Sequence, residues 1–415
     1  DIMCKVGQVV VVGGVRRSAL ISLSNLTDER MRMAKSGDWW VDNQQRALSN
    51  NSVCYTERPD MGIFMKEWLS LYESKSGERG IFNRASAQVK AAANGRRDGD
   101  IEFGTNPCCE IILRPYQFCN LSEVICRADD TIMTLKHKIK LATMLGTFQS
   151  TLTDFGYLRK RWKDTTEEER LLGVSLTGIM DCPAVYDASP EALQQLRDVA
   201  IKTNKRMAEK LGINQSTAVT CVKPSGTVSQ LVDAASGIHA RHNPYYVRTV
   251  RGDNKDPLTM FLKDKGVPSE PDFTAPDNVT VFSFPMKSPE GAICRYDMGA
   301  LEQLELWLKI ADNYCEHKPS VTISVKEHEW LEVGAWCWEH FDSLSGISFL
   351  PFSDHSYKQA PYQDIDREEF KDLTEKMPPA IDWYELQDYE KEDTTTGSQE
   401  LACAGGVCEI VDIGV

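Results

Sequence analysis

Helical and extended patterns alternate along this chain, and their order constrains the fold more than any other feature. Residues 189–212 have the pattern of an amphipathic helix, with a Ser cap, Pro at the first helical position, Leu193 and Leu196 on one side and a closing Gly. Directly after it, residues 217–222 form a β-branched run that ends in the small-residue turn 224–227. This alternation predicts an α/β architecture with substantial parallel pairing.

The same alternation continues on both sides of this unit. The pattern predicts a helix within the first ten residues, a strand from Arg17 and a restarted helix after the 224–227 turn. Further strands are expected at residues 278–284, 320–325 and 346–351, and further helices at 301–315 and 330–341.

Composition narrows the class of protein. The 415 residues, 41% hydrophobic and 26% charged, are enough for a large core. The 47 basic and 61 acidic side chains give a net charge of −14, which argues against a nucleic-acid polymer as partner. No apolar run approaches the length of a membrane span. Thirteen irregularly spaced cysteines favour reduced thiols in a cytoplasmic protein over a disulfide scaffold.

The densest group of reactive side chains lies in residues 104–124, which read GTNPCCEIILRPYQFCNLSEV. If this segment is extended, Asn106, Cys108 and Glu110 alternate and point the same way, and Pro107 favours that geometry at the residue before it. The three side chains offer a hydrogen-bond donor, a sulfur nucleophile or radical carrier, and an acid or base. With Cys119, they are the candidate catalytic residues.

Blander interpretations of this segment stay open. A CysCysGlu sequence is compatible with a buried cysteine pair beside a surface carboxylate. Zinc is a second alternative, but histidine is scarce near the motif and its cysteines lack paired CxxC spacing, so we expect no metal here.

Two other segments carry possible chemistry. Pro224, Ser225, Gly226 and Thr227 can present backbone N–H groups and hydroxyls to a phosphate at a helix N-terminus. The following residues, 236–251, are rich in His, Arg and Tyr, and equally fit a polar surface loop with a satisfied aromatic pair.

The end of the chain changes character. Residues 385–400 are acidic and poor in apolar side chains, which predicts a mobile linker. Cys403 and Cys408 follow it and are separated by AlaGlyGlyVal, a spacing that lets the two sulfurs meet and shuttle electrons to a buried dithiol. A tail with two incidental cysteines is the alternative.

Taken together, these segments resemble the ribonucleotide reductases, specifically the adenosylcobalamin-dependent class II enzymes. The resemblance runs in order through GGVRRSALISL (13–23), SNNSV (49–53), GIFNR (80–84), GTNPCCEIIL with CNLSEV (104–124), GVSLTGIMD (173–181), KPSGTVSQL (223–231), SGIHARHNPYYVRTVR (236–251) and the closing CysX4Cys.

The resemblance implies a role for each candidate residue. Cys108 would carry the thiyl radical that abstracts the ribose 3′-hydrogen, Glu110 would be the base on the 3′-hydroxyl, and Asn106 would hold the ribose hydroxyls. Cys119 would be half of the reducing dithiol. The implied partners are a ribonucleotide, bound through residues 224–227, and a thioredoxin-like or glutaredoxin-like reductant of the Cys403 and Cys408 pair.

The class rests on the source of the radical. Class I large subunits pass it through a Tyr-Tyr pair, and residues 320–330 hold no tyrosine here, so the resemblance implies bound adenosylcobalamin instead. The chain lacks a DxHxxG sequence, so cobalamin would keep its own base on cobalt.

The resemblance also implies a ten-stranded α/β barrel with a central finger loop. Residues 1–384 would be the C-terminal part of that barrel and residues 385–415 the redox tail. Family members carry barrel strands and an allosteric site ahead of the segment equivalent to Asp1, so we expect a fragment that needs an N-terminal partner for activity. The alternatives are a class I type large subunit, a catalytically incomplete nucleotide-binding fragment and a simple thiol oxidoreductase.

Overall fold

Parallel strands make up three small sheets of the protein. The computed structural model describes residues 1–9, 11–12, 16–17, 19–226, 228–273, 276–352 and 359–390. Within these residues the parallel pairs are β3 (Leu20–Ser24), β4 (Ser49–Tyr55) and β5 (Gly80–Asn83); β8 (Asn120–Ile125), β9 (Leu172–Thr177) and β10 (Thr220–Cys221); and β14 (Thr322–Val325) with β15 (Ser348–Pro351).

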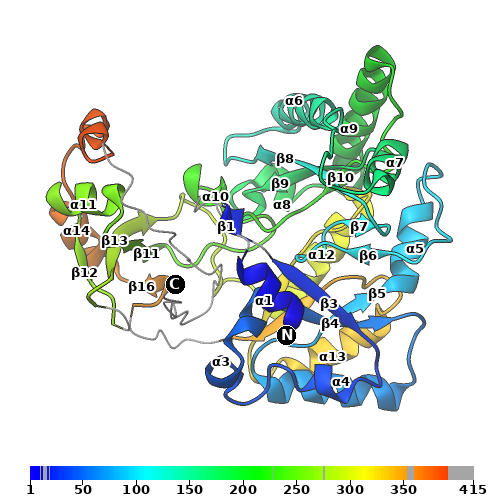
Figure 1. Ribbon diagram of the computed structural model, residues 1–415, viewed down its shortest axis with the longest axis horizontal. Coiled ribbons are helices and arrows are strands. Elements are labelled where there is room, and N and C mark those ends of the chain that lie inside the picture. Colours follow the sequence, from blue (N-terminus) through cyan, green and yellow to red (C-terminus); the bar gives the residue numbers. More distant parts are fainter. Residues whose placement is uncertain are drawn as a thin grey trace.

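Two backbone bridges join these sheets into one arc. Val222 continues β10 and pairs in parallel with Pro319, ahead of β14. Ile81 in β5 pairs antiparallel with Ile347, ahead of β15, through N–H···O distances of 3.0 and 3.1 Å. The order is therefore β8-β9-β10-β14-β15-β5-β4-β3. The strands β8, β9, β10, β5, β4 and β3 are labelled at the right of Figure 1.

The arc is open. Among the described residues, β8 and β3 each have a neighbouring strand on one side only. The expected α/β class is confirmed, but these strands form no closed barrel.

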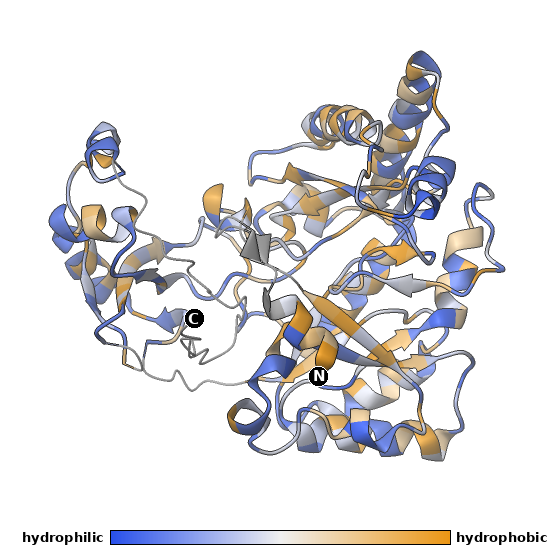
Figure 2. Cartoon of the chain, in the orientation of Figure 1, coloured by the Kyte–Doolittle hydropathy of each residue, from blue (hydrophilic) through white to orange (hydrophobic). Residues whose placement is uncertain are grey.

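Helices cover the outer face of the arc at β8 and β9. Val124, Leu172 and Val174 share one buried cluster with side chains of α6 (Ile132–Gln149) and α9 (Pro190–Leu211). The predicted helix at 189–212 is confirmed in detail, because Ser189 accepts a hydrogen bond from Ala192 N–H and Gly212 ends the helix at φ +65°. Figure 2 shows that α6 carries much hydrophobic colour, whereas α7 (Lys160–Glu169) is largely hydrophilic.

The other predicted helices are also present, although one is shorter than expected. The helices at 301–315 and 330–341 correspond to α12 (Ala300–Asn313) and α13 (Trp330–Glu339). The helix after the 224–227 turn is the short α10 (Val228–Leu231). The remaining elements are β1 (Val11–Val12), β2 (Arg16–Arg17), β6 (Gly104–Thr105), β7 (Ile112–Leu113), α1 (Ile2–Val9), α2 (Glu29–Arg32), α3 (Trp39–Asp42), α4 (Met61–Ser74), α5 (Arg84–Ala92), α8 (Pro183–Tyr186), η1 (Gln44–Leu48) and η2 (Ile179–Asp181).

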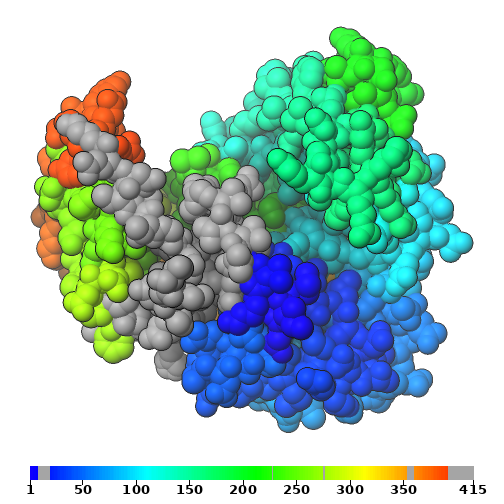
Figure 3. Space-filling view, in the orientation of Figure 1, coloured from blue at the N-terminus to red at the C-terminus, as the bar shows by residue number. Residues whose placement is uncertain are grey.

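A separate antiparallel sheet forms a lobe at the left of Figures 1 and 3. Its order is β12-β13-β11-β16, and β11 pairs with β13 along nine residues, from Tyr245↔Lys287 to Asp253↔Val279. The strand expected at 278–284 is therefore present, and its pairing with β11 is antiparallel. An antiparallel pair needs no crossover helix across the sheet. The elements are β11 (Tyr245–Asp253), α11 (Pro257–Asp264), β12 (Ser269–Pro271), β13 (Val279–Lys287), β16 (Tyr362–Asp364) and α14 (Arg367–Lys376).

The predicted linker begins as ordered structure. The 3-10 helix η3 (Trp383–Asp388) lies against α11, where Glu385 pairs with Lys265 and the Tyr389 hydroxyl donates to Asp264 at 2.9 Å. Residues 391–415, with Cys403 and Cys408, lie outside the described residues. No helix in the described ranges is both long and apolar enough to cross a bilayer.

Candidate active site

The NPCCE motif forms the turn of a tight hairpin. β6 and β7 pair antiparallel, and the N–H of Cys109 donates to the Asn106 carbonyl at 2.9 Å. Cys109 takes a left-handed conformation with φ of +67°. The expectation of one extended segment with Asn106, Cys108 and Glu110 on a common face is therefore wrong, because a chain reversal within these residues breaks the two-residue period.

Polar side chains brace this turn. Asn106 Oδ1 accepts the N–H of Ile111 at 3.0 Å, and the Thr105 hydroxyl donates to the Ile111 carbonyl at 2.8 Å. Asn50 of β4 donates its amide to the Pro107 carbonyl at 2.8 Å. The side-chain oxygen of Asn106 is thus hydrogen-bonded within the turn. The side-chain nitrogen Nδ2 of Asn106 has no acceptor among the described residues.

Glu110 is the buried centre of the site. Its side chain is 0% exposed, and Oε1 accepts a hydrogen bond from Lys223 Nζ at 3.2 Å. Its other oxygen, Oε2, is buried and has no hydrogen-bond partner within the described residues. Buried carboxylate oxygens are normally paired, so Oε2 is a position where a donor from a bound molecule is expected.

Several thiols lie within reach of the Glu110 charge. Burial raises the pKa of Cys108, the negative charge of Glu110 raises it further, and Lys223 opposes both effects. Burial and then Glu110 likewise raise the pKa of Cys119 and that of Cys221 well above the ordinary value. The charge of Glu110 therefore acts on Cys108 and Cys119, and also on Cys221 in β10.

Cys119 is seated just ahead of β8. It packs against a small apolar cluster that contains Ile111 and Cys221. Gly173 in β9 makes this packing possible, since a Cβ there would stand 2.4 Å from Leu121 Cδ2 and 3.1 Å from Cys221 Sγ. A larger residue at 173 would push these side chains apart.

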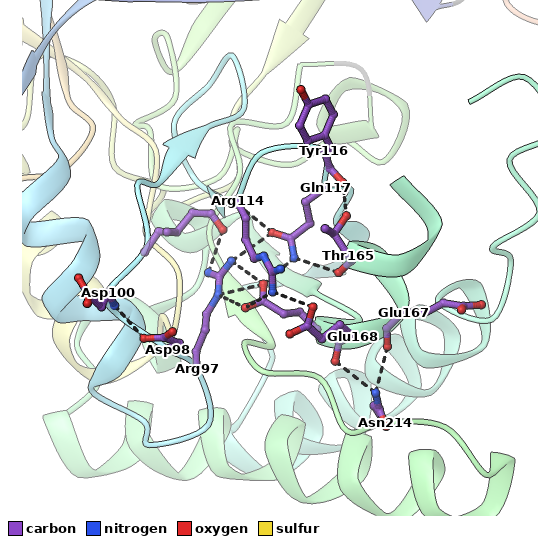
Figure 4. A network of polar contacts seen from close by, with 12 residues as sticks. Arg97, Asp98, Asp100, Arg114, Tyr116, Gln117, Thr165, Glu167, Glu168 and Asn214 are labelled. Carbon is purple, nitrogen blue, oxygen red and sulfur yellow. Dashed lines mark hydrogen bonds and ion pairs between the residues drawn. The ribbon is translucent and has the colours of Figure 1, made fainter. Parts of the chain in front are cut away.

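A buried ion-pair network connects the hairpin that carries Cys108 to the segment that carries Cys119 (Figure 4). The Arg97 guanidinium donates to Glu169 at 2.9 to 3.2 Å, to the Ile112 carbonyl at 2.9 Å and to Gln117 Oε1 at 3.2 Å. Ile112 follows the NPCCE turn, and Gln117 lies two residues before Cys119. Arg97 thus ties the Cys108 hairpin to the Cys119 segment through one fully buried side chain.

The predicted phosphate loop lies beside this centre. Ser225 is buried, and its hydroxyl accepts the N–H of Ser229 at 3.0 Å and so caps α10, whereas Gly226 is exposed. Thr227 lies outside the described residues. Glu123 on β8 faces the loop, and burial raises its pKa while hydrogen bonds to Ser225 and Thr177 oppose that shift.

The residues 236–251 have structural roles. His239 lies between the Ser236 carbonyl and the N–H of Thr322, both at 3.1 Å, and burial lowers its pKa. Arg241 is 5% exposed and pairs with Asp181 at 2.9 Å. A surface loop was therefore the wrong interpretation at these two positions.

Sequence reasoning missed Lys223, Glu123 and Arg97. Lys223 directly precedes the phosphate loop, and Glu123 lies inside CNLSEV, so both stood within noted motifs. Arg97 lies outside the noted motifs, and no neighbouring sequence pattern indicates its role. The described residues contain no group of His, Cys, Asp or Glu that could hold a metal ion.

Several known proteins are similar to this chain in sequence or in fold. No family model matches the chain. The adenosylcobalamin-dependent ribonucleoside-triphosphate reductase of Lactobacillus delbrueckii subsp. bulgaricus is 27% identical over 453 residues, with 99% of this chain and 59% of the relative covered. That of Lactobacillus leichmannii is 26% identical with the same coverage. Over nearly its whole length, the chain is therefore similar in sequence to adenosylcobalamin-dependent reductases.

Solved structures agree in fold with these reductases. A crystal structure of a B12-dependent (class II) ribonucleotide reductase superposes with a TM-score of 0.72 at 22% identity, covering 92% of this chain and 56% of that one. The Actinobacillus ureae class Id reductase alpha subunit gives a TM-score of 0.55 at 14% identity, covering 82% and 72%. The resemblance read from the sequence is confirmed, and the chain spans about three fifths of the length of its curated reductase relatives.

Proposed function

We propose that this chain carries the catalytic residues for reducing ribonucleotides to 2′-deoxyribonucleotides, the precursors of DNA, by thiyl-radical chemistry. The observation that carries the proposal is the grouping of Cys108 and Cys119 around a buried Glu110 whose Oε2 lacks a partner. The sequence relatives are named as reductases of ribonucleoside triphosphates, which makes a triphosphate the first substrate to test.

Each residue has a distinct part in the proposed reaction. Cys108 as a thiyl radical takes the 3′-hydrogen of the ribose, and Glu110 Oε2 accepts the proton of the 3′-hydroxyl. Asn106 Nδ2, which finds no acceptor in the described protein, donates to a ribose hydroxyl. Cys119 and a second thiol supply the two electrons and two protons with which the 2′-hydroxyl leaves as water, and become a disulfide.

Burial suits the thiols to this chemistry. A hydrogen atom is given up by a neutral S–H group, and a raised pKa keeps Cys108 and Cys119 in that form at neutral pH. The same burial keeps water from a radical intermediate.

The residues present fit adenosylcobalamin as the radical source. When bound, this cofactor supplies a carbon–cobalt bond that breaks homolytically. Cys108 is only half-buried, so part of this residue is exposed. His239 and His317 engage both ring nitrogens within the protein, which fits a cofactor that keeps its own base on cobalt.

The loop 224–227 is proposed to bind the substrate phosphates. Buried Ser225 and exposed Gly226 lie at the start of α10, next to Lys223, which reaches Glu110. A phosphate seated there would leave the ribose near the thiols.

The tail is proposed as a separate redox unit, with residues 1–384 as the catalytic part and 385–415 as the tail. Cys403 and Cys408 would re-reduce the active-site disulfide and be reduced in turn by a thioredoxin-like or glutaredoxin-like protein. The described cysteines are all free, which supports a reducing compartment such as the cytoplasm.

We also propose that a further reductase segment closes the arc into a ten-stranded barrel around a central finger loop. The described arc has eight strands, and its ends β8 and β3 each lack a second neighbour among the described residues. An unpaired strand edge is a template for another strand. Cys119 lies just ahead of β8, so a strand added at this edge would lie beside it and would supply the second thiol.

The decisive test is reconstitution. The chain is combined with the N-terminal portion of a class II reductase, adenosylcobalamin and a ribonucleoside triphosphate, and deoxyribonucleotide is measured. Cys108→Ser is expected to abolish product and to leave nucleotide binding intact. Turnover without cobalamin but with a metal-radical protein would support the class I alternative, and nucleotide binding with no turnover in any combination would leave an incomplete binding fragment.

A further inference from the structure

Lys223 stands at the junction between the thiol centre and the phosphate loop. Its backbone N–H donates to Ser175 Oγ at 2.8 Å, and Pro224 after it favours extended backbone. Gly237 packs directly on it, since a Cβ there would lie 2.5 Å from the Lys223 carbonyl. The backbone that carries this side chain is therefore fixed from two sides.

The ammonium of Lys223 reaches the buried carboxylate. Its Nζ lies 3.2 Å from Glu110 Oε1, and no other hydrogen bond or ion pair to that carboxylate is found in the described part of the chain. The Lys223 side chain is 35% exposed whereas Glu110 is 0% exposed, so the cation extends from the solvent side onto a buried anion.

We infer that Lys223 is a positioning residue of this site, whose ammonium keeps the Glu110 carboxylate ionised, holds Oε1, and leaves Oε2 turned toward a substrate hydroxyl. A lone buried carboxylate is strongly disfavoured as an anion and takes up a proton instead. A protonated Glu110 has no use as a base. Lys223 therefore decides whether Glu110 can accept a proton at neutral pH.

Other groups around Glu110 do not replace this cation. Thiols surround the carboxylate, and a thiolate would only add negative charge. Lys318 donates its backbone N–H to the Glu110 carbonyl at 3.1 Å, but burial lowers the pKa of its amine, which has no partner in the described residues. The titratable groups around the site come from the hairpin, from β8, from β10 and from the segment before β14: Cys108, Cys109, Cys119, Glu123, Cys221, Lys223 and Lys318.

The test reads the ionisation of Glu110 directly, without turnover. Infrared spectra of the 415-residue chain are recorded from pH 5 to pH 9 for wild type, Lys223→Met and the double variant Lys223→Met/Glu110→Gln. We expect Lys223→Met to show a protonated carboxyl band near neutral pH that is weak in wild type and missing in the double variant. The titration of this band should move to higher pH than in wild type, because the buried carboxylate has lost its cation.

Two further variants separate positioning from folding. Lys223→Arg keeps the charge and is expected to restore the wild-type titration, and Lys66→Met, on an exposed lysine that pairs with Glu29, should change nothing at Glu110. If Lys223→Met folds poorly, the double variant should fold better, because it removes both members of the pair. The inference is overturned if Lys223→Met leaves the carboxyl band unchanged, or if the double variant is no more stable than Lys223→Met.

The inference takes from the proposed function only the role of Glu110 as base, and the two fail separately. If the carboxyl band shifts but the chain never reduces nucleotides when an N-terminal segment is added, the proposed function is wrong and the role of Lys223 stands. If the reconstituted enzyme is active and Lys223→Met keeps the wild-type pH profile, the proposed function stands and the role of Lys223 is wrong.

Discussion

Replacing Arg97 with methionine should destabilise the chain strongly, because it leaves a buried carboxylate without its cation. The Arg97 side chain is 0% exposed and that of Glu169 5%, and the guanidinium also serves Ile112 and Gln117. Removing one partner of a buried pair costs about 3–5 kcal/mol. We expect a loss near this value in the free energy of unfolding of Arg97→Met.

A double-mutant cycle measures the coupling free energy between Arg97 and Glu169 directly. In Arg97→Met, Glu169 keeps only the Gln117 amide and a distant Arg114 at 3.8 Å. Glu169→Gln removes the stranded charge with almost no change of volume. The free energy of unfolding lost in the double variant Arg97→Met/Glu169→Gln should therefore be smaller, by about 2 kcal/mol, than the sum of the losses in the two single variants.

Urea unfolding followed by tryptophan fluorescence measures these differences. Lys160→Met is the matched control, since Lys160 pairs with Asp164 at 2.7 Å on the same helix as Glu169 but is 83% exposed. Such an exposed pair contributes about 0.3–0.5 kcal/mol. A loss below about 1 kcal/mol for Arg97→Met, or strict additivity in the double variant, would refute the reasoning.

The network also has a chemical consequence for Cys119. Because Arg97 joins the Cys108 hairpin to the Cys119 segment, its loss should let that segment open. Alkylation of Cys119, resolved by peptide mass spectrometry, should become faster in Arg97→Met than in wild type. An unchanged rate in the folded variant would show that other contacts hold Cys119.

Three further outcomes follow from single contacts. Gly173→Ala should destabilise the chain by about 1–3 kcal/mol through overpacking against Leu121 and Cys221, measured by thermal unfolding. Gly237→Ala should cost about 1–3 kcal/mol, because Gly237 has φ of +56° and its Cβ would strike the Lys223 carbonyl, and the Glu110 infrared band should shift with it. His317 has its pKa lowered from 6.5 to about 3, mainly by burial, so the unfolded chain binds the extra proton more readily. Neutral His317 therefore favours the folded state fully above pH 6.5, and the free energy of unfolding should fall by about 2 kcal/mol between pH 6.5 and 5. In His317→Gln this dependence on pH should be weaker, as measured by urea unfolding at several pH values.

Local sequence chemistry was sufficient for much of the fold. The helix at 189–212 could be predicted to the residue because its Ser cap, N-terminal Pro and closing Gly act within one turn of each end. Pairing direction was harder. The strand near residue 280 has the same β-branched composition whether its neighbour runs parallel or antiparallel, so composition alone could not separate the arc from the antiparallel lobe.

The candidate residues could be named from the sequence, but the shape of the segment that carries them could not. Cys108, Glu110 and Cys119 stood out by type, but the turn depends on a left-handed Cys109, which a non-glycine residue rarely adopts. The hairpin overrides that local preference, because the Thr105 and Asn106 side chains both bind Ile111 and close the turn.

The charges that organise the site were beyond any local pattern. Lys223 lies 113 residues from Glu110, and Arg97 lies 72 residues from Glu169. Each cation becomes meaningful only once the arc of strands is assembled and water has been removed from its partner, since the energy of an ion pair depends on the medium around it. The sequence therefore names the thiols and the acid, while the tertiary fold decides which cation lies beside the acid. For this reason the infrared titration of Glu110 probes the assembled site more directly than any change made within the NPCCE motif itself.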